Sequence, residues 1–180
     1  MLQYVILCII SLLIIAAIII RIKFQFWAIQ PVFHIYDIHH WLFPNKIVNE
    51  ELPEVNKYVN LIDINTINAN DATTENKAEL CNFINKHYLR SKTASYEPTE
   101  EDIIPYLTTN LGKSFITTYT SPIVEGSAKK EIVGVMTSRP LFINFKNGTN
   151  MRVNYVDNLT VKKGKRKQGI APRIIQTYYY

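Results

Sequence analysis

The stretch from Asn158 to Ile175, NLTVKKGKRKQGIAPRII, decides the expected fold. It reads as the end of a strand, a turn crowded with lysine and arginine, and a helix that begins near Gly169. The first N–H groups of a helix lack backbone partners and lie at the positive end of the helix dipole, so they attract anions. Glycine lets the backbone approach a phosphate closely, and Pro172 suits a first helical turn. The stretch predicts a phosphate site, with a solvated lysine-rich loop as the alternative reading.

The pattern of apolar residues places this stretch at the end of an α/β domain. The expected strands are Tyr58–Ile67, Ser114–Thr120, Glu131–Met136 continuing to Phe145, and Met151–Val161, and the expected helices are Thr74–Arg90, a helix that starts at Thr99, and Gln168–Tyr180. Asn147 and Gly148 form the strongest short hairpin signal. This order predicts a mixed sheet with flanking helices, antiparallel at first and then feeding a helix.

An uncharged apolar run occupies the N-terminal end of the chain, from Val5 to Ile20. With the residues before it, the run is about 20 residues long, enough to span a hydrocarbon core of roughly 30 Å as a helix. A cleaved signal peptide fits poorly, because no positive side chain precedes the run and no small-residue cleavage site follows it. Arg21 and Lys23 flank the run on its C-terminal side. The positive-inside rule then predicts a single-pass anchor with the body in the cytosol or in the interior of a virion.

The expected organisation has three parts. Residues 1–22 form the transmembrane anchor, with residues 2–20 contacting lipid. Residues 23–53 are rich in aromatic residues and proline, and residues 54–180 form the α/β domain. The 180 residues, with a hydrophobic fraction of 47%, exclude wholesale disorder.

Composition also excludes several kinds of site. Cys8 and Cys81 are the two cysteines of the sequence, too few for a disulfide scaffold. His34, His39 and His40 cluster without a strong metal-binding spacing, so we expect no metal. The net charge of +5 is concentrated in the basic turn, and we expect no nucleic-acid partner.

Three stretches of the sequence resemble motifs of known acyltransferases. The spacing R-x-x-G-x-A at Arg166, Gly169 and Ala171 is similar to the acyl-CoA pyrophosphate motif of the GNAT acyltransferase superfamily. The segment from Phe24 to Val32, FQFWAIQPV, resembles the FW-x-x-QPV signature of N-myristoyltransferases. The segment LTVKK that starts at Leu159 and the IAP that follows resemble a later motif of the same family, in the same order along the chain.

The resemblance implies acyl-CoA, in this family myristoyl-CoA, as a co-substrate and no tightly bound cofactor. It implies that the acyl group goes to an amine, such as the N-terminal glycine of a peptide. It also implies an oxyanion hole formed by the backbone N–H groups of Asn158 and Leu159. The residues implied to bind CoA are Gln25, Phe26, Trp27, Thr160, Val161, Arg166, Lys167, Gly169, Ile170 and Ala171.

The chain also departs from the family. Asn158 stands where the family usually has phenylalanine, and Gly169 where it often has arginine. The family's catalytic base is the terminal carboxylate of a second, peptide-binding half, so the resemblance implies a truncated chain without that half or that base. Strand alternation predicts that the carboxylate of Asp157 points away from Asn158. A different GNAT enzyme, such as an acetyltransferase, and a non-catalytic anchored viral protein that keeps the fold remain open as alternatives.

Overall fold

The computed structural model of the chain describes residues 2–32, 38–43, 51–88, 96–121, 130–146 and 148–180. The chain divides into two units, Met1–Leu52 and Pro53–Tyr180, each of which is described by itself. The three-part division expected from the sequence stays a prediction.

The first unit contains a long apolar helix and two short helices. Helix α1 (Leu2–Lys23) has no acidic residue in its first turn and ends with Arg21 and Lys23. Its stretch Gln3–Lys23 has a mean hydropathy of 3.2 and buries none of its side chains in the protein. By length and composition, α1 is therefore able to cross a membrane. The short helices are α2 (Gln25–Ala28) and α3 (Ile38–Leu42).

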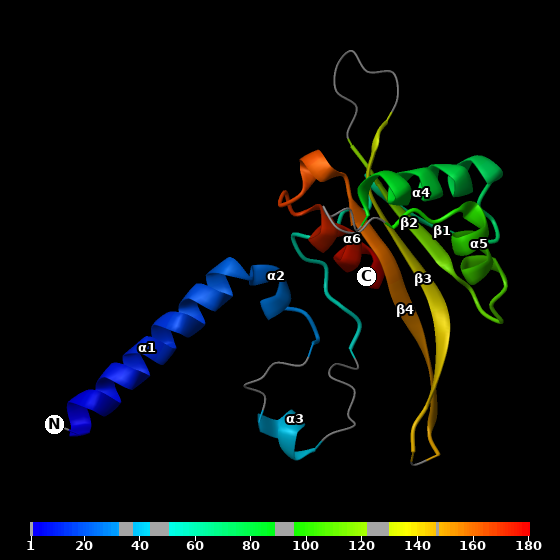
Figure 1. The fold of residues 1–180 in the computed structure, drawn as a ribbon. Coiled ribbons are helices and arrows are strands. Elements are labelled where there is room, and N and C mark those ends of the chain that lie inside the picture. Colours follow the sequence, from blue (N-terminus) through cyan, green and yellow to red (C-terminus); the bar gives the residue numbers. More distant parts are fainter. Residues whose placement is uncertain (1, 33–37, 44–50, 89–95, 122–129, 147) are drawn as a thin grey trace. The chain divides into compact units, whose positions relative to one another are not determined.

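The second unit is built on an antiparallel sheet whose strand order equals the sequence order (Figure 1). The strands are β1 (Ile64–Asn68), β2 (Phe115–Thr120), β3 (Ile132–Asn144) and β4 (Asn150–Val161). Each strand pairs antiparallel with the next. The α/β class and the antiparallel start of the sheet, both expected from the sequence, are confirmed.

Three helices accompany the sheet: α4 (Thr74–His87), α5 (Glu100–Thr108) and α6 (Ile170–Tyr179). Thr73 caps α4, because its side chain accepts a hydrogen bond of 3.2 Å from the backbone N–H of Asn76. The predicted capping box at the start of α5 is present. A short 3₁₀ turn, Lys163–Lys165, lies between β4 and α6.

The hydrophobic core lies on both faces of the sheet. Helices α4 and α5 cover one face and α6 covers the other, as Figure 1 shows. The first cluster consists of Ala69, Ala72, Leu80, Cys81, Phe83, Ile84, Ile103, Leu107, Ile116 and Val135. The second consists of Ile64, Tyr119, Val133, Met136, Ile170 and Ile174. The second cluster matters for the site, because it fixes α6 against β3.

Three sequence expectations concern the ends of elements and the hairpin turn. The first strand begins at Ile64 rather than Tyr58, because the side chain of Asn60 accepts hydrogen bonds from the backbone N–H groups of Ile62 and Asp63 and holds a turn there. The predicted end of α4 at Arg90 lies outside the described residues, and the described helix ends at His87. In the predicted hairpin turn, Asn147 lies outside the described residues, and Gly148 has φ +84°.

Candidate functional site

A β-bulge interrupts β4 at the two residues expected to form an oxyanion hole. Between regular cross-strand pairs, the single β3 residue Met136 faces both Asn158 and Leu159. Asn158 has φ 52°, which lies in the left-handed region that asparagine tolerates better than most residues. A bulge of this kind turns backbone groups out of the regular ladder and is often found beside active sites.

Side-chain hydrogen bonds fix the conformation of the bulge. The side-chain amide of Asn158 donates through Nδ2 to the hydroxyl of buried Thr137 at 3.1 Å. That hydroxyl donates to the backbone carbonyl of Asp157 at 3.2 Å. On the other side, the hydroxyl of buried Thr160 donates to the Asn158 carbonyl at 2.9 Å. Thr160, one of the residues implied to bind CoA, therefore also holds the bulge in place.

The carboxylate of Asp157 lies at the bulge. Its Oδ1 accepts a hydrogen bond of 2.7 Å from the backbone N–H of Asn158. Strand alternation predicts the opposite direction, and that prediction is wrong because the bulge breaks the alternation at this point. One of the two expected oxyanion donors is thus occupied by an anion of the protein itself.

A cavity of about 290 Å³ opens beside the bulge. Asp157 and Asn158 form one wall, and residues of α5 such as Ile103 and Tyr106 form another. Arg139 also lines it, with its guanidinium 5.6 Å from the centre of the Tyr106 ring. The cavity places an apolar helix surface, a carboxylate and the bulge around one space.

The predicted phosphate-binding turn lies between β4 and α6. Gly169 is the N-cap of α6 with φ 75°, and Lys167 has φ 64°. A Cβ built on Gly169 meets no atom within 4 Å, so the space in front of the helix start is open. Ile170 is buried and Ala171 is partly buried in the first turn, with Pro172 after them. The local conformation agrees with a helix start that offers its N–H groups to an anion.

Arg166 is engaged with the protein backbone. Its Nη2 donates to the carbonyl of His87 at 2.5 Å, and its Nε donates to the carbonyl of Val161 at 3.3 Å. The guanidinium therefore joins the end of α4 to the end of β4. Arg166 thus lies beside the turn, and two of its N–H donors bind backbone carbonyls of the protein.

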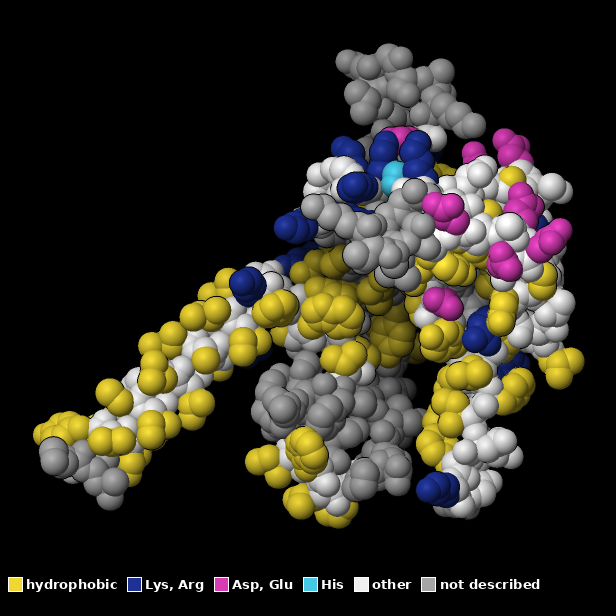
Figure 2. All heavy atoms as spheres, viewed as in Figure 1, with side chains coloured by type: hydrophobic (Ala, Val, Ile, Leu, Met, Phe, Trp, Pro, Cys, Tyr) yellow, Lys and Arg dark blue, Asp and Glu magenta, His cyan; other side chains and the backbone are white. Residues whose placement is uncertain are grey.

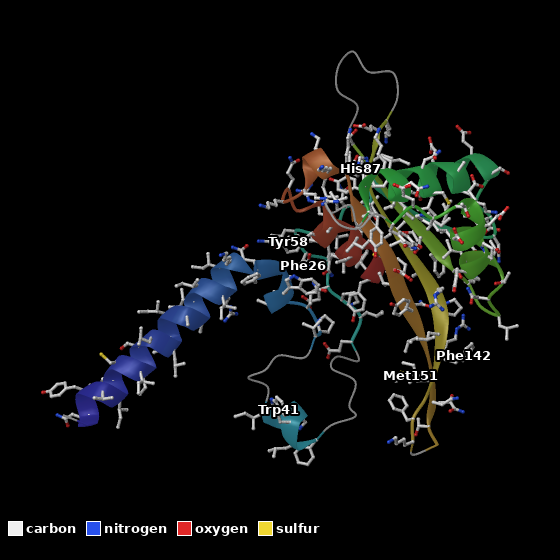
Figure 3. All side chains as sticks on the ribbon, in the orientation of Figure 1. Phe26, Trp41, Tyr58, His87, Phe142 and Met151 are labelled. Carbon is white, nitrogen blue, oxygen red and sulfur yellow. The ribbon has the colours of Figure 1, made fainter. Side chains whose placement is uncertain are left out.

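Positive charge gathers around this turn. Figure 2 shows Lys and Arg side chains clustered there beside a histidine, and Figure 3 labels that histidine as His87. Burial and the nearby cations Lys86, Lys162 and Arg166 lower the pKa of His87. The imidazole Nδ1 is buried and makes no hydrogen bond within the described part of the chain. The lowered pKa disfavours the charged imidazole, so lysine and arginine side chains carry the positive charge at this end of the sheet.

The helix that carries the turn is anchored tightly. Gly134 of β3 leaves room for it, since a Cβ at Gly134 would lie 2.6 Å from Ile174 Cδ1 and 3.0 Å from Ile170 Cγ2. Arg173 Nη1 donates to the hydroxyl of Tyr119 at 3.0 Å. These contacts hold the first turn of α6 in position relative to β2 and β3.

The expected CoA contacts Gln25, Phe26 and Trp27 belong to the first unit, where they form α2. Phe26 is buried, and its ring meets that of half-exposed Trp27 edge-on at 5.1 Å between centroids. Their role in binding CoA stays a prediction. Among the described residues, no group of three or more His, Cys, Asp or Glu could hold a metal ion. Of the histidine cluster, His34 lies outside those residues, and His39 packs on Phe43.

Comparisons with known proteins agree with the fold. No protein-family model matches the chain, and no curated protein matches it. The crystal structure of Saccharomyces cerevisiae N-myristoyltransferase with bound myristoyl-CoA is similar, with a TM-score of 0.55 and 16% sequence identity. The similarity covers 85% of this chain and 36% of that chain. The chain thus has an N-myristoyltransferase-like α/β fold and spans little more than a third of that enzyme's length.

Proposed function

We propose that this chain is a membrane-anchored, N-myristoyltransferase-like protein whose second unit binds acyl-CoA for transfer of the acyl group to an amine. The observation that carries the proposal is the left-handed bulge at Asn158 and Leu159, followed by a helix that starts at Gly169. The bulge supplies donors for a carbonyl oxygen, and the helix start supplies donors for a phosphate. The similar fold of an enzyme that is seen with bound myristoyl-CoA supports the same ligand class.

In this proposal, the pyrophosphate of CoA lies at the first turn of α6. Lys167 and the N–H groups after Gly169 would contact it, while Arg166 keeps the turn attached to α4. Thr160 and Val161 at the end of β4 would lie along the pantetheine, which leads the thioester to the bulge.

The proposed reaction is direct attack of a neutral amine on the thioester carbonyl. The new C–N bond forms, negative charge develops on the carbonyl oxygen, and the C–S bond then breaks to release CoA thiolate. The amides of Asn158 and Leu159 would stabilise the developing charge in a site that excludes water. The ammonium formed by attack gives up a proton, and a nearby carboxylate is a suitable acceptor.

Asp157 affects this reaction in two ways. Its carboxylate accepts the hydrogen bond of the Asn158 backbone N–H, so the carbonyl of a bound thioester has to displace it. Once displaced, it remains on the wall of the same cavity and would accept the proton of the attacking amine. If it is not displaced, the chain binds acyl-CoA without transferring the acyl group, which is the alternative of a non-catalytic anchored protein.

Acyl-CoA binding tests the proposal first. We expect Gly169→Val to weaken myristoyl-CoA binding in titration calorimetry by at least about tenfold, because a β-branched residue is strained at positive φ and fills the space before the helix start. Gly164→Ala is the matched control, since a Cβ there meets nothing within 4 Å and its φ is not in the left-handed region. Equal affinities for the two variants would contradict the proposed site.

A turnover assay distinguishes whether Asp157 accepts the proton of the attacking amine or only blocks the Asn158 N–H. The assay measures release of CoA from myristoyl-CoA in the presence of a glycine-terminal peptide. A transferase loses turnover in Asp157→Asn while it keeps acyl-CoA binding, since the amide is nearly the same size as the carboxylate but a much weaker base. Binding without any CoA release in the unchanged protein would support the non-catalytic alternative.

A further inference from the structure

The β3–β4 hairpin extends well beyond the rest of the sheet. Strand β2 pairs with β3 only as far as Ser138, whereas β3 and β4 continue through six more pairs, from Arg139 with Tyr155 to Asn144 with Asn150. At about 3.3 Å per residue, this two-stranded extension is roughly 20 Å long. Figure 1 shows it projecting beyond the helices of the second unit.

Beyond the Arg139–Tyr155 pair at its base, one face of the extension is apolar. Cross-strand partners lie on the same face, so the pairs Leu141–Val153 and Ile143–Met151 stack in a row, with Phe145 next toward the turn. None of these residues belongs to either core cluster. Phe142, on the other face, is 59% exposed, and Phe145 is 36% exposed. Figure 3 labels Phe142 and Met151 on this projecting arm.

The charge of the extension has a single sign. From Ser138 to Val156 the sequence has no aspartate or glutamate, and its charged residues are Arg139, Lys146 and Arg152. Arg139 is held between aromatic rings, 5.1 Å from the centre of Tyr155 and 5.6 Å from that of Tyr106. Lys146 is exposed beside the turn, next to Phe145. An apolar face beside basic residues, behind a polar turn, suits an anionic lipid surface, where the charges and the turn meet headgroups and the apolar side chains enter the interface.

We infer that the tip of the β3–β4 hairpin inserts into the interface of the anionic membrane that α1 is proposed to span. The inference rests on the proposed anchor, which would keep the second unit near one bilayer surface. A depth of about 5–10 Å corresponds to two or three residues of each strand. Counted from the turn, those residues include Phe145 on one side and Met151 on the other, and Ile143 lies one residue farther from the turn. A second copy of the chain is a poorer occupant, because apposed tips would bring lysine and arginine of both copies together.

The test uses the full chain reconstituted into vesicles of phosphatidylcholine and phosphatidylserine at a ratio of about 7:3. In a Cys8→Ser, Cys81→Ala background, an environment-sensitive fluorophore is attached at Phe145→Cys, and lipids brominated on their acyl chains serve as quenchers. The matched position is Leu111→Cys, an apolar residue that is 97% exposed outside the hairpin. We expect at least twofold stronger quenching at position 145 than at position 111. Equal quenching at the two positions would overturn the inference.

Charge provides a second variant. Lys146→Glu should reduce the quenching at position 145, and Lys113→Glu, an exposed lysine outside the hairpin, should leave it unchanged. Equal effects of the two variants would overturn lipid contact. So would self-quenching of the label that rises with protein density while brominated lipid has no effect, and this result would indicate contact with a second copy of the chain. Alkali resistance and myristoyl-CoA binding are measured on the same vesicles. They report on the anchor and the acyl-CoA site independently, so a failure of the hairpin inference is distinguishable from a failure of the proposed function.

Discussion

Replacing Gly134 with alanine should loosen α6 from the sheet. The added Cβ would lie 2.6 Å from Ile174 Cδ1, while carbon atoms in favourable contact are about 3.5–4.0 Å apart, so the overlap is about 1 Å. Ile174 is fully buried in the second core cluster, so moving its terminal methyl group aside disturbs the packing of that cluster. Overpacking of this kind costs about 1–3 kcal/mol of unfolding free energy.

A double-mutant cycle isolates this contact. Ile174→Val removes the Cδ1 atom that the new methyl group would strike, at a cost of about 0.5–1.5 kcal/mol by itself. We therefore expect the double variant to be only slightly less stable than Ile174→Val alone, with a coupling free energy of about 1 kcal/mol or more. The assay is urea unfolding of the full chain in mild detergent, followed by circular dichroism. Additive losses within about 0.3 kcal/mol would refute the packing of α6 against Gly134.

Three further predictions concern alkali, titration and thiol chemistry. The full chain should stay in the membrane fraction after alkaline carbonate extraction and lose this resistance when residues 2–20 are deleted; a soluble full-length protein would contradict the anchor. The pKa of His87 is lowered from 6.5, chiefly by burial, so below pH 6.5 the unfolded chain binds a proton that the folded chain does not. Unfolding free energy should therefore fall as pH drops below 6.5, and His87→Gln should reduce that fall; identical pH profiles would exclude this role. Burial raises the pKa of the Cys81 thiol to about 11, so in a Cys8→Ser background iodoacetamide should react slowly at pH 8 until the chain is unfolded, as mass spectrometry would show.

Local signals in the sequence predict most elements of the second unit. The helix that starts at Thr99 follows from its capping box, and the apolar side of α6 follows from the spacing of Ile170 and Ile174. These signals succeed because caps and periodicity act over a few residues. The beginning of β1 is misplaced because the Asn60 side chain competes for backbone N–H groups, and this competition outweighs the strand propensity of Tyr58 and Val59.

Local sequence signals predict less of the candidate site than of the fold. The position of the bulge follows from family resemblance, but the direction of Asp157 depends on a left-handed residue that strand alternation does not anticipate. Arg166 illustrates a second difficulty, since its donor reaches His87, which is 79 positions away in the sequence. A basic motif indicates where charge is concentrated. Which of its side chains remain available to a ligand depends on contacts that form only when distant elements come together.

The order of strands in the sheet has a consequence for synthesis on the ribosome. Because β1, β2, β3 and β4 pair in the order in which they emerge, each strand finds the edge of its partner already translated. The sheet can therefore grow by one strand at a time, with the longest wait between β1 and β2, which α4 and α5 separate in the sequence. The bulge and the turn before α6 follow the other three strands of this sheet in the sequence. The proposed acyl-CoA site would thus form against strands that have already been translated.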